Sequence, residues 1–134
     1  MHGAALMNAN KLRYFSAAVF SLVVLPAYAG STMTVLEFSN SAVANSSSQP
    51  LAVAPMPPLL EQTPVDFSSG AAQSSAFSSG TTYVRLQCSV RCSIKFEVGS
   101  ASVTTSNVAL GADQPEYFGV TRGAGFKVSV IASP

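Results

Sequence analysis

The chain has 134 residues, of which 10% are charged and 48% hydrophobic, and its formal net charge at pH 7 is +1. This length suits a single domain with or without extensions. So few charged residues exclude a coiled coil or a solvated helical bundle, and the near-neutral balance lacks the basic footprint of a nucleic-acid-binding protein. A composition poor in charge and rich in Ser, Thr and Val instead favours β-structure.

Residues 1–29 have the pattern of a secretory signal peptide. Lys11 and Arg13 precede an apolar run from Tyr14 to Leu25, and an A-x-A cleavage site follows at residues 27–29. The run is shorter than the ~20 residues that a bilayer span requires, so no stable membrane span is expected. The alternative is that translation begins at Met33 and that the preceding residues are an upstream extension.

A proline-rich arm is predicted between two strands. Thr34 to Phe38 is expected to form a short strand with Leu36 and Phe38 on one face, and five prolines then interrupt the mostly apolar residues 50–64. Because each proline lacks a backbone donor and fixes φ, we predict that residues 50–61 are extended and lie on a surface. They form either an edge segment of their own domain or a contact with a neighbouring subunit, since a monomer would cover their apolar side chains poorly. The candidate contact residues are Leu51, Val53, Met56, Leu59 and Leu60.

The clearest pattern runs through residues 83–98. Apolar residues occupy every second position from Val84 to Val98, with polar residues between them, which is typical of a half-buried strand. One unbroken strand would exceed the usual length of roughly 3–10 residues. We therefore predict a hairpin that turns at residues 89–91 and leaves Arg85, Arg91 and Lys95 facing solvent.

Further strand-like segments occur at residues 63–69, 108–110, 116–120 and 126–131, separated by turns rich in Gly, Ser or Thr. This spacing predicts an all-β fold, a single antiparallel β-sandwich of about seven to nine short strands. Three parts are expected, namely the leader 1–29, the strand and arm 30–61, and the sandwich domain 62–134. The expected core residues are Phe67, Phe77, Val84, Leu86, Ile94, Phe96, Phe118, Val120, Phe126, Val128 and Val130.

The segments Thr82–Leu86, Cys92–Phe96, Leu110–Val120 and Gly125–Ile131 resemble, in this order, small β-rich bacteriophage virion proteins of the head-decoration or head-surface type. Thr34–Phe38 is similar to the start of such proteins. The resemblance spans residues 82–131 and implies a structural role in the virion, with capsid or other virion subunits as partners. The arm adds an expectation of self-association. The leader instead favours an exported bacterial β-domain of a pilus, adhesin or coat, in the periplasm or outside the cell.

The sequence offers no convincing catalytic arrangement. A serine nucleophile needs a base, usually His, and the sole histidine is His2. Asp113 and Glu116 flank a proline at an expected turn and should be solvated, whereas a working acid–base pair needs perturbed surroundings. Residues 123–125 lack the Lys-Ser/Thr that completes a phosphate loop. We therefore predict no enzyme, no catalytic residues, no cofactor or metal, and neither a small-molecule substrate nor nucleic acid as partner.

Cys88 and Cys92 lie at the two ends of the expected turn. Opposed positions on paired strands bring Cβ atoms within about 4.5–5.5 Å, close to the separation that a disulfide requires. Two cysteines without further ligands are a poor zinc site, which takes four. A disulfide is feasible, and the compartment decides whether it forms. An exported chain meets an oxidising environment and a chain folding in the cytoplasm does not.

Overall fold

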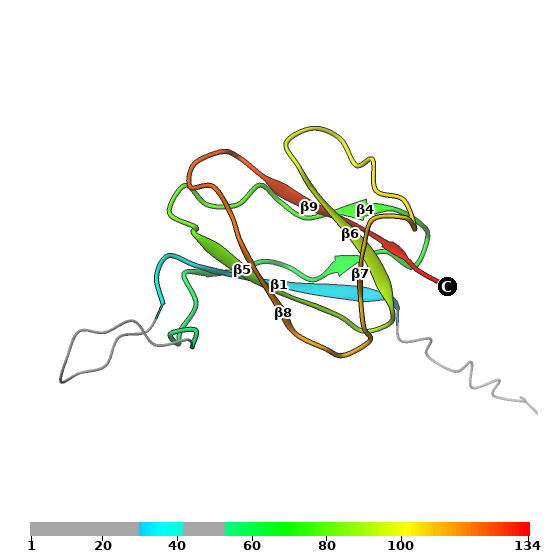
Figure 1. The fold of residues 1–134 in the computed structure, drawn as a ribbon, viewed down its shortest axis with the longest axis horizontal. Coiled ribbons are helices and arrows are strands. Elements are labelled where there is room, and N and C mark those ends of the chain that lie inside the picture. Colours follow the sequence, from blue (N-terminus) through cyan, green and yellow to red (C-terminus); the bar gives the residue numbers. More distant parts are fainter. Residues whose placement is uncertain (1–29, 42–52) are drawn as a thin grey trace, which may run out of the picture.

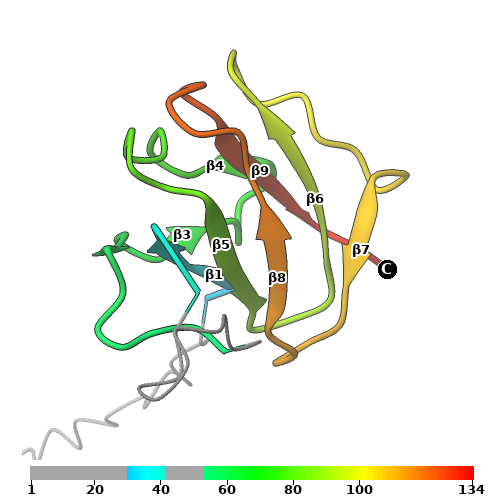
Figure 2. The ribbon, with the colours of Figure 1, turned by 60° about the vertical axis from the view of Figure 1, so that its left-hand side comes forward.

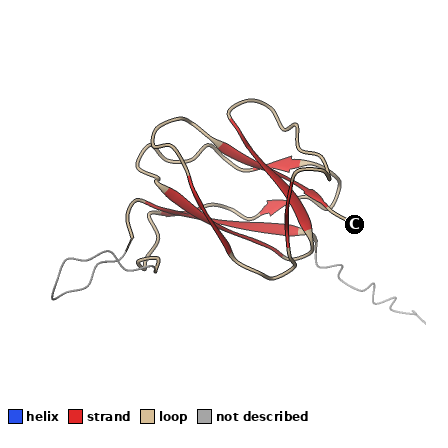
Figure 3. Ribbon diagram, viewed as in Figure 1, coloured by secondary structure: helices blue, strands red, loops and turns tan. Residues whose placement is uncertain are grey.

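Nine strands form two antiparallel sheets that pack face to face in the computed structural model, which describes residues 30–41 and 53–134 (Figure 1). Strands and connecting loops account for the whole of these two ranges, and neither contains a helix (Figure 3). The antiparallel β-sandwich predicted from the sequence is therefore confirmed. The strands are β1 (Thr32–Phe38), β2 (Leu60–Glu61), β3 (Val65–Asp66), β4 (Ala72–Gln73), β5 (Tyr83–Cys88), β6 (Cys92–Glu97), β7 (Val108–Leu110), β8 (Glu116–Gly119) and β9 (Lys127–Ala132).

The five-stranded sheet has the order β2-β1-β5-β8, and β3 also pairs with β1, further along the same edge. Residues 59–67 follow β1 closely, since Leu59 N–H donates to Glu37 O at 2.8 Å and Phe67 N–H donates to Ser31 O at 2.8 Å. Pro64 lies between β2 and β3, and a proline cannot donate to the strand ladder. The predicted strand over residues 63–69 is therefore reduced to β3.

The four-stranded sheet has the order β4-β9-β6-β7. β9 and β6 lie at its centre and pair over six residues, from Cys92 opposite Ala132 to Glu97 opposite Lys127. Two glycines shape the turn that leads into β9, because Gly123 and Gly125 have φ values of 70° and 66°, a region that side chains with a Cβ disfavour.

The predicted hairpin at residues 89–91 is wrong. β5 belongs to the five-stranded sheet and β6 to the four-stranded sheet, so residues 89–91 form an arch that carries the chain across the sandwich. The alternating pattern identifies which face of each strand is buried, but it does not identify the strand's neighbour. An arch also buries both apolar faces, by turning them toward one another across the core instead of placing them side by side. The chain also changes sheet at β3–β4, β4–β5, β7–β8 and β8–β9.

The core lies between the two sheets. All the predicted core residues belong to it, either fully buried as Leu86 and Val130 are, or packed against it as Phe118 and Phe126 are. The core also contains residues that were not predicted, among them Val65, Leu110, and Met33 and Val35 of β1, of which the last two are fully buried. No helix long and apolar enough to cross a membrane occurs in residues 30–41 and 53–134.

Candidate functional site

A groove of about 510 Å³ lies on the outer face of the five-stranded sheet. β1, β5 and β8 contribute Phe38, Tyr83, Arg85 and Tyr117 to its lining, and the arm contributes residues 53–56 from one side. Residues 53–56 precede β2 and lie close to the end of β1 (Figure 1). The groove is therefore built from parts of the chain that are far apart in sequence.

The floor of the groove is apolar because β1 is unusual among the strands. Its inward residues are Met33, Val35 and Glu37, so Leu36 and Phe38 face outward. Phe38 is nevertheless only 1% exposed. The arm and the neighbouring tyrosine cover this side of β1, which gives the sheet a second apolar surface outside the sandwich core.

Three aromatic rings cross the groove floor from β1 to β8. The ring of Phe38 stacks on Tyr83 with centroids 4.9 Å apart, and Tyr83 is 6.5 Å from Tyr117 at a tilt of 47°. The hydroxyl of Tyr83 donates to Asn40 O at 2.9 Å, and burial, followed by charge interaction with Tyr117, raises the pKa of Tyr83. Tyr117 is 54% exposed at the outer end of this row, so its ring is accessible from solvent.

Arg85 supplies the groove's positive charge. Its guanidinium donates to Gln87 Oε1 at 3.0 Å and forms no ion pair within residues 30–41 and 53–134, where Lys95–Glu97 is the ion pair present. The remaining residues, 1–29 and 42–52, contain no Asp or Glu. A carboxylate or a carbonyl oxygen on a partner that enters the groove could therefore pair with Arg85 without displacing an acidic side chain of this chain.

The arm is tied to the sandwich through the buried carboxylate of Glu37. Gln62 Nε2 donates to its Oε1 at 2.7 Å, Ser78 N–H donates to its Oε2 at 2.8 Å, and the Thr81 hydroxyl donates to the same Oε2. Gln62 also exchanges two hydrogen bonds with the backbone of Ser75, at 3.0 and 3.3 Å. One side chain of β1 thereby joins Gln62, directly after the arm, to the loop between β4 and β5.

The structure places the predicted contact residues in two groups. Val53 and Met56 line the groove, and they are 57% and 74% exposed. Leu59 and Leu60 are also exposed, at the start of the segment that pairs with β1. Leu51 lies outside the described residues. The end of the arm is thus an edge segment of its own domain, and Val53, Met56, Leu59 and Leu60 stay exposed.

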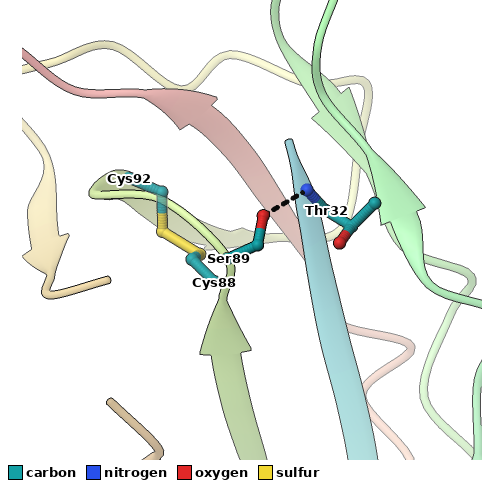
Figure 4. The surroundings of a disulfide bond; sticks show 4 residues. All are labelled: Thr32, Cys88, Ser89 and Cys92. Carbon is teal, nitrogen blue, oxygen red and sulfur yellow. Dashed lines mark hydrogen bonds between the residues drawn. A yellow bond between two sulfur atoms is a disulfide. The ribbon is translucent and has the colours of Figure 1, made fainter. Parts of the chain in front are cut away.

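Cys88 and Cys92 are joined by a disulfide across the arch, with their Cα atoms 6.4 Å apart (Figure 4). Both residues are fully buried. Ser89 holds the arch against β1, since its N–H donates to Thr32 O and its Oγ accepts from Thr32 N–H, both at 2.9 Å. The bond therefore links the two sheets at one end of the sandwich instead of the two strands of a hairpin.

Sequence reasoning missed the groove and the role of Glu37. Within a short strand, the alternation of Leu36 and Phe38 indicated an apolar face, but it did not indicate that this face lies outside the core. A glutamate between them would ordinarily point to solvent. The donors that make its burial possible come from residues 25 to 44 positions away, so no local signal was present.

The described residues contain no group of three or more His, Cys, Asp or Glu side chains arranged to hold a metal ion. The chain matches no family model, no curated protein and no solved structure.

The groove is suited to binding the apolar and aromatic side chains of another protein, because its aromatic floor and the Met56 side chain both offer large, adaptable contact areas.

Proposed function

We propose that this chain is a non-enzymatic structural protein of a bacteriophage particle, a capsid-decoration, head-surface or other minor virion component that acts by protein–protein assembly. The observation that carries the proposal is the apolar groove beside an arm whose Val53 and Met56 are more than half exposed. The resemblance of residues 82–131 to phage virion proteins supports the particle as the place of assembly.

The composition of the groove favours a protein partner. Aromatic residues, Met and Arg are enriched in the centres of protein interfaces, and Tyr83, Tyr117, Met56 and Arg85 lie together here. Contiguous exposed apolar surface of this kind marks interaction sites in soluble proteins. We therefore expect a neighbouring virion subunit to insert apolar side chains between the arm and β8.

The test replaces the two arm residues in the groove and follows incorporation into particles. Val53→Ser with Met56→Ser should lower the number of copies per purified virion on the order of tenfold, because truncating buried interface anchors costs at least 1–2 kcal/mol. Val98→Ser is the matched control, since Val98 is 59% exposed and lies at the end of β6, in the other sheet. Quantitative mass spectrometry of purified particles provides the measurement.

Two results would overturn the proposal. One is the absence of the unmodified chain from particles, and the other is incorporation of the arm variant at the control level. Thermal unfolding of each variant, with a Tm within a few degrees of the unmodified chain, establishes that reduced incorporation does not reflect unfolding.

The second candidate is an exported bacterial β-domain of a pilus, adhesin or coat. The disulfide between Cys88 and Cys92 favours it, because such bonds persist in oxidising compartments, and the signal-like leader agrees. Recovery of the bridged chain, cleaved after residue 29, from a periplasmic or extracellular fraction would decide for this alternative. Recovery from purified particles would decide for the virion.

A further inference from the structure

A hydroxyl and a carboxamide meet at the buried carboxylate of Glu37. The Thr81 hydroxyl donates to its Oε2, and Gln62 Nε2 donates to its Oε1 at 2.7 Å. Thr81 belongs to the loop between β4 and β5, which passes from the four-stranded to the five-stranded sheet (Figure 2), and Gln62 directly follows β2. The exposed fractions are 0% for Glu37, 1% for Thr81 and 6% for Gln62. The two groups are thus held away from water on the two oxygens of one carboxylate.

The amide of Gln62 is bonded in a way that favours attack on its carbon atom, Cδ. Ser75 N–H donates to Gln62 Oε1 at 3.0 Å, and a backbone donor at this oxygen stabilises the negative charge that develops there when a nucleophile adds to Cδ. On the other side, Nε2 already donates to the carboxylate of Glu37, so an acid–base group lies at the nitrogen that must leave.

Glu37 is placed to act as the base for Thr81. A hydroxyl becomes a useful nucleophile when an adjacent base accepts its proton, and the Thr81 hydroxyl donates directly to this carboxylate. Burying a carboxylate is costly unless it is paired, and no Lys or Arg of residues 30–41 and 53–134 forms an ion pair with Glu37. Anchoring the arm does not by itself require a charged side chain, whereas proton transfer does.

We propose that Thr81 and Gln62 form an ester cross-link within the chain, with Glu37 as the acid–base group. Thr81 Oγ1 bonds to Gln62 Cδ while the hydroxyl proton passes to Glu37. The Cδ–Nε2 bond then breaks as Glu37 returns a proton to Nε2, and the nitrogen leaves as ammonia. The carboxylate is regenerated, and no oxidant, reductant or other reactant is consumed. The reaction occurs once in each chain, so it is not enzymatic turnover.

The surroundings suit both the formation and the survival of the ester. Because one carboxylate holds both groups, rotation of their side chains is sufficient to bring Oγ1 within the roughly 3–3.5 Å of Cδ that attack requires. Burial then excludes the water that hydrolyses an exposed ester. The product fixes the end of the arm covalently to the loop that leads into β5. The hydrogen bonds described above belong to the chain before this reaction, and stability changes expected from them apply to that state.

The first test is mass spectrometry of the full chain after reduction of its disulfide. The peptides that carry residues 62 and 81 should be recovered as one joined species, lighter than their sum by one water and one further change of amide to acid, which together equal the loss of one ammonia. Mild alkali in denaturant should separate them and leave glutamate at position 62. A folded chain that retains this ammonia after prolonged incubation, or that loses ammonia elsewhere only, would overturn the proposal.

Variants assign the roles of the three side chains. Thr81→Val lacks the nucleophile and Glu37→Gln lacks the base, so both should retain the ammonia, whereas Thr81→Ser keeps a hydroxyl and should lose it. Thr82→Val is the matched control, because the Thr82 hydroxyl donates to backbone carbonyls of residues 38 and 39, and the cross-link should form as in the unmodified chain. Cross-linking of Glu37→Gln to the unmodified extent contradicts the role of the base. The unmodified chain and Thr81→Ser keep the test decisive where another variant does not fold.

The cross-link does not depend on the virion role, and the two fail separately. A chain that forms the ester and never enters particles contradicts the virion role alone. A chain that enters particles with the amide of Gln62 intact contradicts the cross-link alone.

Discussion

Replacing Glu37 by alanine tests whether its buried carboxylate holds the arm to the sandwich. The carboxylate accepts three hydrogen bonds, from Gln62, Ser78 and Thr81. After the change, Gln62 retains the carbonyl of Ser75, while the Ser78 N–H and the Thr81 hydroxyl lose their acceptor. Each buried donor left without a partner costs about 1–3 kcal/mol. The free energy of unfolding should therefore fall by about 4 kcal/mol, a large part of the 5–15 kcal/mol typical of a domain.

The assay combines thermal or denaturant unfolding with hydrogen exchange. At about 5 °C per kcal/mol for a domain of this size, Glu37→Ala should lower Tm by about 20 °C, and the Ser78 amide should exchange much faster at a temperature where the variant is folded. Thr81→Val removes a single donor and should cost about 1–2 kcal/mol.

Glu61→Ala is the matched control, because Glu61 is exposed on the neighbouring strand, and such surface changes usually stay within about 0.5 kcal/mol. A Glu37→Ala variant with the Tm of this control and a Ser78 amide that stays protected would refute the role assigned to the carboxylate.

Three further outcomes are expected. Replacing Cys88 and Cys92 together by alanine should cost about 2 kcal/mol from the entropy of closing a five-residue loop, and intact mass with and without reductant reports the bond in the isolated chain. The pKa of Glu97 is lowered to about 2 by hydrogen bonds from the Ser102 hydroxyl, the Ser129 hydroxyl and the Ser102 backbone. Its stabilising effect is therefore complete above about pH 4.5 and is lost toward pH 2, so the Tm difference between the unmodified chain and Glu97→Gln should vanish on acidification; a constant difference would contradict this. Leu86→Ala should cost about 2–5 kcal/mol in chemical denaturation, because Leu86 is fully buried between the sheets, and a loss below 1 kcal/mol would place it outside the core.

The strands and their buried faces could be predicted because period-two alternation is a local property. Residues 83–98 show how far this alternation predicts the structure. β5 and β6 begin and end close to the expected positions, and they bury the expected side chains. Which strands lie next to each other is not a local property, because it depends on parts of the chain that are distant in sequence. The same alternation is compatible with a hairpin and with an arch, and what distinguishes them is which distant strands, β1 and β9, take the adjacent places.

The groove could be predicted only in part, for a related reason. Proline spacing predicted an extended arm on the surface, but the described part of the arm bends at residues 53, 56 and 57 and pairs with β1 only at its end, in β2. The apolar Val53 and Met56 predicted a contact surface, and this stays a prediction. The sequence did not show that this arm would lie over the outer side of β1. That arrangement depends on Leu36 and Phe38 facing away from the core. They face outward because the side chain of Glu37, between them, points into the sandwich and is hydrogen-bonded there.

Glu37 couples the core to the groove because it anchors the arm from both sides of its own strand. Its backbone carbonyl accepts from Leu59 N–H at 2.8 Å at the sheet edge, and its side chain accepts from Gln62 inside the sandwich at 2.7 Å. The four residues from Leu59 to Gln62 are thus fixed at both ends to one residue of β1, and Val53 and Met56 reach the groove from this fixed point. A change that loosens the carboxylate should therefore alter the groove wall as well as the stability. Gln62→Leu, which keeps the backbone bond between Leu59 and Glu37 and removes the side-chain bonds to Glu37 and Ser75, separates these two effects. Incorporation that falls further for Gln62→Leu than for a surface variant of equal Tm would show that the arm's position, and not the stability of the fold alone, determines assembly.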